Sequence, residues 1–470
     1  MPPRDNNRAN TTVSPEWDTS LVRQYDVAGP RYTSYPTANL FHDQYTAADY
    51  LALAADEHAS AEPLSLYLHI PFCRDICYYC ACNKVVTRKQ EQVVGFLEAI
   101  KRELAMRGAL HGRRPVKQLH WGGGTPTYLT PAQMTELMFY TSRHFNTSLD
   151  EDREYSIEID PRTVSDDSLA LLKGLGFNRI SMGVQDFDPD VQRAVNRIQS
   201  AQSVDHLVST ARDLGFASLS FDLIYGLPRQ TTGTFAQTID HVIALSPDRI
   251  SLYNYAHLPE RFPSQRAIAR QTIPGPEEKL EILSDAGSRL LDAGYEHIGM
   301  DHFVKPDDEL AVARQRRRLQ RNFQGYSSAF APDLIGLGPS AISRFRDSFS
   351  QNAKDPQSWA QAIDSGSLPI VRGLHMSSED KLREHIIMSI ACQLELDIAA
   401  AEHHFHFNFN EKFAANLPQL RQFEQDGLIQ VTPDKVRVLP RGRLLLRNIC
   451  MIFDDYLENN HAGTRFSRTI

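Results

Sequence analysis

Residues 67–82 read YLHIPFCRDICYYCAC, in which a short apolar run leads into three closely spaced cysteines, Cys73, Cys77 and Cys80. The spacing C-x3-C-x2-C supplies three thiolates from one loop. A [4Fe–4S] cluster usually takes four cysteines, so three protein ligands would leave one iron open. An open coordination position is typical of a metal site that carries out chemistry. A zinc site and plain buried thiols are the alternatives, although the three-residue gap fits common zinc motifs poorly.

This cysteine spacing resembles the signature of radical S-adenosylmethionine (SAM) enzymes. The resemblance implies that the open iron binds the amino and carboxylate groups of SAM. It also implies that an electron from the cluster cleaves SAM to a 5′-deoxyadenosyl radical. Cys82 lies two residues beyond Cys80, which is too near for an easy fourth ligand of the same cluster. We therefore interpret Cys82 as a possible catalytic residue that does not ligate iron.

The composition indicates a globular protein of more than one domain. The chain has 470 residues, of which 41% are hydrophobic, and this length exceeds one ordinary core. The formal net charge of −8 argues against general nucleic-acid binding, because phosphate affinity comes from Lys and Arg. Four of the six cysteines fall within residues 73–82, which is typical of metal ligands in a reducing cytoplasm rather than of disulfides. We expect no signal peptide and no membrane span, and a monomer is the default.

Short apolar runs alternate with amphipathic stretches from about residue 64. The strand candidates are residues 65–70, 118–121, 155–159, 179–183, 218–224 and 249–253. The helix candidates between them are residues 91–106, 131–143, 166–175, 201–214 and 235–244. This alternation predicts an α/β fold, a partial and open (β/α)6 barrel of parallel strands, with an open doubly wound sheet as the alternative. In either fold, functional groups gather at the carboxyl ends of the strands.

The flanking segments indicate further parts. Residues 1–20 are predicted to be a flexible N-terminal arm, and residues 21–63 an N-terminal segment that packs over the active site. Residues 64–376 would form the catalytic barrel and its extension, including a helix at 277–293. Residues 377–470 would form a mostly helical, winged-helix-like domain with a β-hairpin at 428–438.

The segment HWGGGTPT at residues 120–127 follows the second predicted strand. Three successive glycines remove side chains where the backbone must approach a partner closely. A tight strand-to-helix turn would need fewer glycines, so we favour contact with a ligand. In radical SAM proteins, which this region resembles, the glycine segment binds the SAM amino group.

Polar residues lie at the ends of the next strands. Glu158 projects opposite its isoleucine neighbours on the third strand, and burying such a carboxylate without a partner is costly. A ribose diol and a structural salt bridge are equally good partners for it. Gln185 ends the fourth strand, Asp222 lies in the fifth, and Arg197 is expected on the helix after strand four. Each residue alone is a weak signal, but their shared position strengthens the set.

Motifs along almost the whole chain resemble one family, the oxygen-independent coproporphyrinogen III oxidases of haem biosynthesis. They include GPRYTSYPT at residues 29–37, DLIYGLP at 222–228, IGMDHF at 298–303 and NFQGY at 322–326. The related haem-chaperone branch typically has an aromatic residue where this chain has Cys82, and it lacks the long N-terminal arm. Both features favour the oxidase over a chaperone that binds haem without oxidase activity.

The resemblance implies one [4Fe–4S] cluster, held by Cys73, Cys77 and Cys80, and two SAM molecules per chain. By motif position, the contacts of the first SAM would be Tyr67, Gly123, Glu158 and Ile342. The contacts of the second SAM would be Tyr79, Gly124, Thr125, Gln185, Arg197, Asp222 and Ala256. The implied substrate is coproporphyrinogen III, and the implied electron donor is a reductant such as flavodoxin or ferredoxin.

The four carboxylates of such a substrate must meet cationic groups. Residues 314–321, RQRRRLQR, are basic, and as a helix they would place Arg317 and Arg321 on one stripe and Arg316 elsewhere. We predict that Arg317 or Arg321 contacts a propionate and that Arg316 faces solvent. A solvated basic helix face is the alternative, in which case the propionate site would lie in residues 31–35.

Overall fold

The computed structural model describes residues 15–16, 18–55, 62–147, 150–329, 331–459, 466 and 468. Most of the predicted N-terminal arm therefore lies outside the described residues. Its last part is helical, because α1 (Thr19–Tyr25) begins there, with Asp18 accepting hydrogen bonds from the backbone N–H groups of Ser20 and Leu21.

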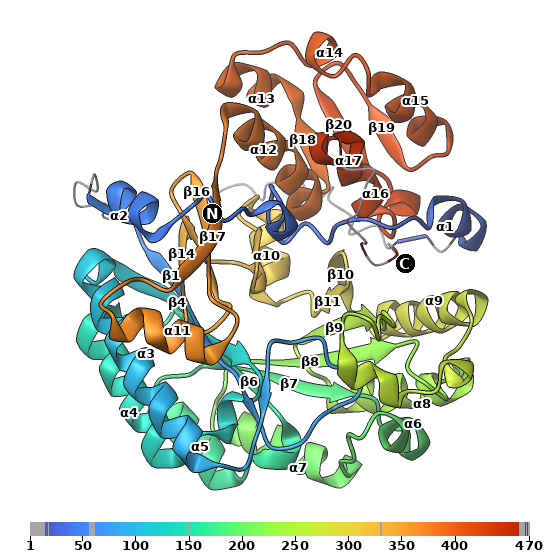
Figure 1. The fold of residues 1–470 in the computed structure, drawn as a ribbon. Helices are drawn as coiled ribbons and strands as arrows, with labels where there is room; N and C mark the ends of the chain where they lie inside the picture. The colour runs from blue at the N-terminus through green and yellow to red at the C-terminus, as the bar shows by residue number, and fades with distance from the viewer. Residues whose placement is uncertain are drawn as a thin grey trace, which may run out of the picture.

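All six predicted strands are present and lie side by side in chain order. Their bounds are β1 (Leu64–Ile70), β4 (Pro115–Gly123), β6 (Glu154–Ile159), β7 (Arg179–Gln185), β8 (Ser218–Tyr225) and β9 (Arg249–Asn254). Each pairs parallel with the next. The strands curve around a central space, which Figure 1 shows as an incomplete ring. The predicted parallel barrel is confirmed.

The sheet continues beyond both ends of this parallel core. After β1 come β14 (Asp333–Leu337), β15 (Ile342–Phe345), β16 (Ser348–Asn352) and β17 (Ile370–His375), and after β9 come β11 (His302–Val304) and β10 (Glu296–Gly299). Strand β14 is parallel to β1, whereas the others pair antiparallel. Within the described residues β10 and β17 do not pair with each other, so the barrel stays open. The sequence analysis missed these strands because most have only three to five residues.

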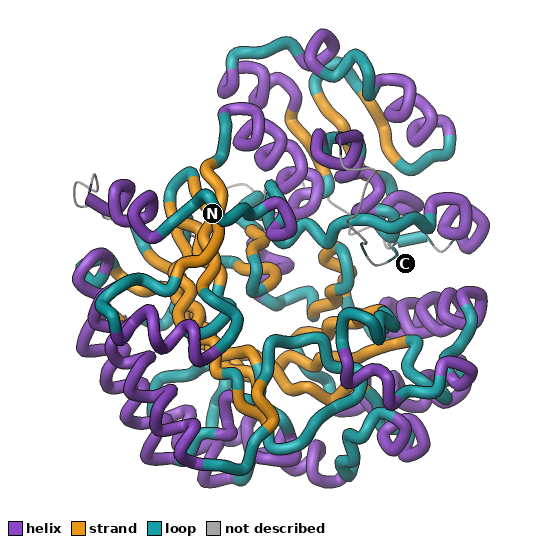
Figure 2. Tube along the Cα trace, in the orientation of Figure 1, coloured by secondary structure: helices purple, strands orange, loops and turns teal. Residues whose placement is uncertain are grey.

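Helices cover the outer face of the parallel core (Figures 1 and 2). They are α3 (Gln90–His111), α4 (Pro131–His144), α5 (Asp166–Gly174), α6 (Pro189–Ala194), α7 (Ala201–Asp213), α8 (Thr232–Leu245) and α9 (Pro276–Asp292). The predicted helices correspond to all of these except the short α6, which was not predicted, and α3 extends five residues beyond its predicted end. Thr130 and Gln133 form a capping box at the start of α4, followed by Pro131 at the first helical position.

The side chains of the strands alternate between an apolar outer face and a polar inner face. On β8, Leu219, Phe221 and Leu223 are fully buried against the helices, whereas Ser220 and Asp222 between them are only partly buried. Fully burying such an apolar side chain contributes about 2 kcal/mol. The inner face encloses a cavity of about 160 Å3, and serine, arginine and glutamate side chains are among those that line it. This polar interior explains why the strand pattern was so clear in the sequence.

The C-terminal part is a separate helical body with a small sheet. Its strands β18 (Glu395–Asp397), β19 (Ile429–Val431) and β20 (Lys435–Val438) pair antiparallel, with β20 in the middle. Its helices are α12 (Ser378–Gln393), α13 (Ile398–Phe405), α14 (Phe409–Lys412), α15 (Leu417–Gln425), α16 (Leu446–Met451) and α17 (Asp455–Asn459). The predicted hairpin is confirmed, and β18 adds a third strand.

The N-terminal segment joins the two bodies. Tyr32 and Tyr35 belong to the apolar core of the C-terminal part, whereas Tyr45 and Tyr50 belong to the core of the barrel. The Tyr32 hydroxyl donates to Asp454 at 2.8 Å. The remaining short elements are α2 (Ala47–Ala55), α10 (Glu309–Gln315), α11 (Pro356–Asp364), β2 (Phe72–Cys73), β3 (Val85–Val86), β5 (Asn146–Thr147), β12 (Gln320–Asn322) and β13 (Gly325–Ser327).

The single basic helix predicted over residues 314–321 is wrong. Helix α10 ends at Gln315, Arg317 has a positive φ of 56°, and β12 then pairs with β13. The buried apolar positions of α10 stop at Ala313, and the five residues after it are polar. Without an apolar face to bury, a short helix is not stable enough to continue.

Candidate active site

A cavity of about 490 Å3 opens at the carboxyl ends of β4, β6, β7 and β8. Most of the predicted site residues line it. They are Cys73, Cys77, Tyr79, Cys80, Cys82, Gly123, Gly124, Thr125, Glu158, Gln185, Arg197 and Asp222. The structure therefore brings together residues that the sequence spreads over 150 positions. The cavity is also lined by Lys84, Asp160, Arg162, Ser181 and Tyr253, to which the sequence analysis gave no role.

The cysteine loop is held at both ends and from one side. Phe72 and Cys73 pair parallel with Val85 and Val86, which closes the loop at its base. The carbonyl of Cys80 accepts hydrogen bonds from Lys84 Nζ at 3.1 Å and from Ser264 Oγ at 3.2 Å. A fixed loop of this kind presents its thiols in a defined geometry.

Positively charged and hydroxyl groups point at the cysteine sulfurs. Arg162 and Arg197 each donate to Cys77 Sγ at 3.6 Å, and the Thr125 hydroxyl donates to Cys73 Sγ at 3.6 Å. A thiolate is the form that ligates iron, and such donors can pair with its charge. Burial raises the pKa of Cys73 to about 11, and the hydrogen bond from Thr125 opposes that rise. In a [4Fe–4S] cube each cysteine binds a different iron, so the three sulfurs need not converge on one point. The donor set fits that cluster.

Cys82 interacts with Cys80. The interaction with Cys82, together with the charge of Lys84, lowers the pKa of Cys80 to about 6, whereas the same interaction and burial raise the pKa of Cys82. A role for Cys82 other than ligation stays a prediction.

The glycine run is required by close contacts within the protein. A Cβ atom at Gly122 would lie 2.7 Å from Glu158 Oε1, and one at Gly124 would lie 2.6 Å from the carbonyl oxygen of Pro71. Gly123 has a φ of 114°, which favours glycine. The run thus lets β4 and the cysteine loop approach each other, and Gly123 and Gly124 also line the cavity.

Glu158 has a structural partner and also lines the cavity. His120 Nε2 lies 3.1 Å from Glu158 Oε1, and the Gly123 N–H donates to Glu158 Oε2 at 3.3 Å. Burial would raise the pKa of Glu158, but the hydrogen bond and charge of His120 lower it overall. The His120 ring stacks on Tyr67 at 5.8 Å between centroids, and Ser156 binds its other nitrogen at 2.6 Å. Glu158 is therefore held as a carboxylate.

Asp222 is a second carboxyl group at the same cavity. Ser181 Oγ donates to it at 3.0 Å, and no cation pairs with it within the described residues. Burial and the charge of Glu158 raise its pKa to about 6. A cationic ligand beside Asp222 would supply the missing counter-charge.

Arg197 does not lie on a helix, contrary to the prediction. Helix α6 ends at Ala194, and Arg197 follows Asn196, whose φ is positive at 55°. From this turn Arg197 donates to Asp160 at 3.0 Å and to the carbonyl of Gly183. Burial would raise the pKa of Asp160, but Arg197 and Arg162 lower it overall. The signal that could have found Asp160 and Arg162 is their position directly after β6.

Three predicted contacts do not line this cavity. Tyr67 lies on β1 and reaches the site through its stacking on His120. Ala256 lines a different cavity, on the outer side of β8 and β9. Ile342 lies on β15 and packs against the cluster formed by Phe41 and Phe349.

Two regions of the chain match known protein families, and almost the whole chain matches known proteins. Residues 67–242 match the family described as the Radical SAM superfamily, and residues 376–445 match the HemN C-terminal domain. The protein from Pseudomonas aeruginosa named oxygen-independent coproporphyrinogen III oxidase is 48% identical, over 97% of this chain and 99% of that protein. The Escherichia coli protein of the same name is 45% identical over the same shares.

A solved structure gives the same result. The structure titled as coproporphyrinogen III oxidase (HemN) from Escherichia coli, a radical SAM enzyme, has a TM-score of 0.90 and 44% identity. It covers 94% of this chain, and the alignment spans 100% of that chain. The chain therefore belongs to the oxygen-independent coproporphyrinogen III oxidases, which are radical SAM enzymes.

Proposed function

We propose that this chain converts coproporphyrinogen III to protoporphyrinogen IX by oxidative decarboxylation of two propionate side chains. In each round a propionate becomes a vinyl group, CO2 leaves, one hydrogen atom is abstracted and one electron passes to an acceptor. The observation that carries the proposal is the joint lining of one cavity by the cysteine loop and the polar strand ends, in a chain that matches its relatives from end to end. The reaction belongs to oxygen-independent haem biosynthesis.

The cluster and SAM, when bound, supply a carbon radical that can take a hydrogen that no base can remove. Cys73, Cys77 and Cys80 hold the one [4Fe–4S] cluster in this proposal. Arg162 and Arg197, which both donate to Cys77 Sγ, stabilise negative charge there. The other residues that line the cavity bind and orient the ligands.

Two SAM molecules bind per chain in this proposal. The first contacts Tyr67, Gly123, Glu158 and Ile342, and the second contacts Tyr79, Gly124, Thr125, Gln185, Arg197, Asp222 and Ala256. Glu158 and Asp222 both line this cavity, and Asp222 has no cationic partner in the described residues, which supports the binding of cationic ligands. Because Ala256 and Ile342 lie outside the main cavity, they are the least supported contacts of the set.

Arg321 is the residue best suited to hold a substrate propionate. It is only 9% exposed and has no carboxylate within ion-pair distance in the described part of the chain. It donates hydrogen bonds to the carbonyls of Tyr32 at 3.3 Å and Arg31 at 3.4 Å, and its Nη1 has no partner among the described residues. A buried guanidinium without a counter-ion is costly until an anion binds. Arg317 does not qualify, because it pairs with Glu395 at the surface.

Arg31 extends this site toward the active cavity. Its guanidinium lies 5.8 Å from the ring centroid of Tyr253, which lines the cavity. This contact supports the proposal that residues 21–63 pack over the active site. Residues 64–376 then form the catalytic barrel and its extension, and residues 377–470 the C-terminal domain.

The proposal extends to the surroundings of the enzyme. A reductant such as flavodoxin or ferredoxin delivers electrons, and the protein acts as a monomer in the cytoplasm, without nucleic acid or membrane as partner. Within the described residues, no helix is long and apolar enough to cross a membrane.

The test is product analysis under anaerobic conditions. Protein with a reconstituted cluster, SAM and a chemical reductant should convert coproporphyrinogen III to protoporphyrinogen IX. SAM cleavage without that product would instead favour a haem chaperone. Equilibrium binding should give about two SAM per chain, falling to about one when Gln185 and Asp222 are both substituted. A wild-type stoichiometry of one would contradict the second SAM without affecting the assignment of the reaction.

A further inference from the structure

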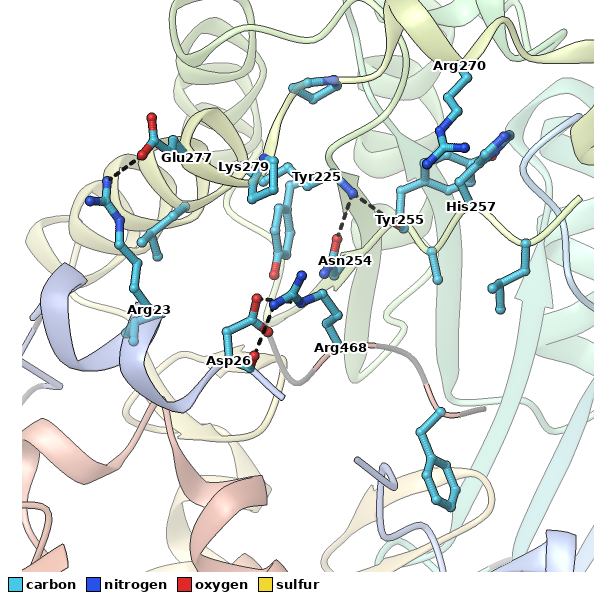
Figure 3. A pocket seen from close by; sticks show the side chains of 17 residues that line it. Arg23, Asp26, Tyr225, Asn254, Tyr255, His257, Arg270, Glu277, Lys279 and Arg468 are labelled. Atoms are coloured by element: carbon cyan, nitrogen blue, oxygen red, sulfur yellow. Dashed lines mark hydrogen bonds and ion pairs between the residues drawn. The ribbon is translucent and has the colours of Figure 1, made fainter. Parts of the chain in front are cut away.

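A second cavity, larger than the active one, lies on the outer side of the barrel. Its volume is about 730 Å3, within the range of small-molecule sites. It is bounded by the ends of β8 and β9, the start of α9, α1, and the C-terminal residues Phe466 and Arg468 (Figure 3). Asn254 lines this cavity, whereas Tyr253, its neighbour on β9, lines the active one. The two cavities therefore lie on opposite faces of the same strand.

The charges around this outer cavity do not balance. Arg468 pairs with Asp26 at 2.7 Å, and Arg23 pairs with Glu277 at 3.6 Å. Lys279 and Arg270 are left without a carboxylate partner among the described residues. A net positive cavity in a chain of net charge −8 indicates a specific arrangement rather than a general surface property.

Lys279 is built into the cavity rather than placed at its rim. Its Nζ donates to the carbonyl of Tyr255 at 2.8 Å and lies 3.4 Å from Asn254 Oδ1, so its hydrogen-bond partners are neutral. Gly226 makes room for it, because a Cβ there would lie 2.6 Å from Lys279 Cε. Burial lowers the pKa of Lys279 to about 8, and the charge of Asp26 offsets this only in part.

Arg270 and His257 line the same cavity as Lys279, and Figure 3 draws these two together at one side of it. Burial lowers the pKa of His257, the charges of Arg270 and Lys279 lower it further, and the charge of Glu260 acts in the opposite direction. A dianion in this cavity would meet both cations.

The rest of the cavity wall suits the uncharged part of an organic ligand. Tyr225 is only 3% exposed and lines the cavity, yet its hydroxyl has no hydrogen-bond partner among the described residues. That hydroxyl can therefore donate to an oxygen or nitrogen of a ligand in the cavity. Val22, Leu258 and Leu280 add apolar surface. The cavity therefore offers cations for an acidic group and mixed walls for an organic body.

We propose that this outer cavity binds a phosphate monoester of mononucleotide size, with the phosphate on Lys279 and Arg270 and the body beside Tyr225. A phosphate monoester carries close to two negative charges at neutral pH, whereas a single carboxylate carries one. It therefore matches the two unpaired cations. Its oxygens also match the several donors of an arginine fork and an ammonium group. Neither Lys279 nor Arg270 is among the cluster and SAM contacts proposed above, although Ala256 lines this cavity too.

The test uses the full-length enzyme with its cluster, under anaerobic conditions and saturating SAM, so that the SAM sites are filled. Equilibrium dialysis compares FMN with riboflavin and AMP with adenosine, pairs that differ only in the phosphate. At least one phosphate compound should bind roughly tenfold or more tightly than its neutral counterpart. Equal binding within both pairs would overturn the proposal. The phosphate compound that binds more tightly shows whether the cavity prefers a flavin or an adenosine group.

Two variants locate the binding. Lys279→Met keeps the length of the side chain and removes its charge, and Arg270→Gln changes an exposed residue that the fold does not need. Each variant should bind the phosphate compound roughly tenfold more weakly than the wild type. Arg266→Gln, on the same connection but outside the cavity, should bind it like the wild type. Unchanged binding in both cavity variants would place the ligand elsewhere. SAM cleavage in the absence of nucleotide should stay normal in all three variants. A negative result in the binding experiment can therefore be told apart from a failure of the proposed reaction.

Discussion

Asp222→Asn should make the SAM-free protein more stable at neutral pH. Burial and the charge of Glu158 raise the pKa of Asp222 from 3.8 to about 6. The folded protein therefore binds this proton more tightly than the unfolded chain does. Stability falls as the pH rises from about 4 to about 6, and the cost remains in full above that range. Asparagine carries no charge and avoids the cost.

The expected gain follows from the two pKa values. A difference of this size corresponds to about 3 kcal/mol of unfolding free energy. Asparagine keeps a side-chain oxygen that can accept the hydrogen bond from Ser181, which is 3.0 Å in the wild type. The gain should therefore approach about 3 kcal/mol at pH 8 and vanish near pH 4.

Urea unfolding of cluster-free protein at pH 8 and pH 4 measures this difference. Asp213→Asn, at an exposed position on α7, serves as the control and should follow the wild type at both pH values. SAM binding should weaken in Asp222→Asn, because the cationic ligand loses its partner. A variant that is no more stable than the wild type at pH 8, or equally stabilised at pH 4, would refute the electrostatic account of Asp222.

Cys77→Ser should abolish the visible absorption of the cluster and all SAM cleavage, and a variant with full iron content and normal turnover would rule out Cys77 as a ligand. Cys82→Ser should keep about four irons per chain but impair turnover; loss of iron would make it a ligand, and full activity would make it a packing residue. Arg321→Ala should raise the KM for coproporphyrinogen III roughly tenfold or more with cluster content unchanged, as product analysis can measure. Arg317→Ala and Arg316→Ala are its controls, and equal KM values in all three would move the propionate site elsewhere.

The parallel core could be predicted because its interior is polar. Each strand places apolar residues against the helices and polar residues inward, so the sequence alternates strictly. The strand-end residues could be grouped from the sequence because the carboxyl ends of parallel strands meet at one edge. The cysteines could be recognised from their spacing alone. What the sequence did not show are contacts between distant residues. Nothing near Arg317 indicates that Glu395, 78 positions away, is its partner.

Local patterns also failed where elements are short. The strands after β9 have too few residues to show alternation, so the extension of the sheet was missed. Arg197 was expected on the helix after the fourth strand, but α6 ends at Ala194 and Asn196 adopts a left-handed conformation. The roles of Asp160 and Arg162 depend on their distance to Cys77, which is a property of the folded loop.

The support of the cysteine loop by a distant segment sets an order for assembly during synthesis. Gln265 donates to the carbonyl of Tyr79 at 3.1 Å and accepts from the N–H of Leu258 at 2.6 Å, so one buried side chain ties the loop to the segment after β9. Tyr79 and Gln265 are 186 residues apart. At a synthesis rate of about 5–20 residues per second, the ribosome needs about 10–40 s to make that stretch. Throughout this interval the three cysteines have left the ribosome without the segment that fixes them. The loop therefore gains this support only after synthesis of the sixth parallel strand, and in a nascent chain stalled before it the three cysteines lack it.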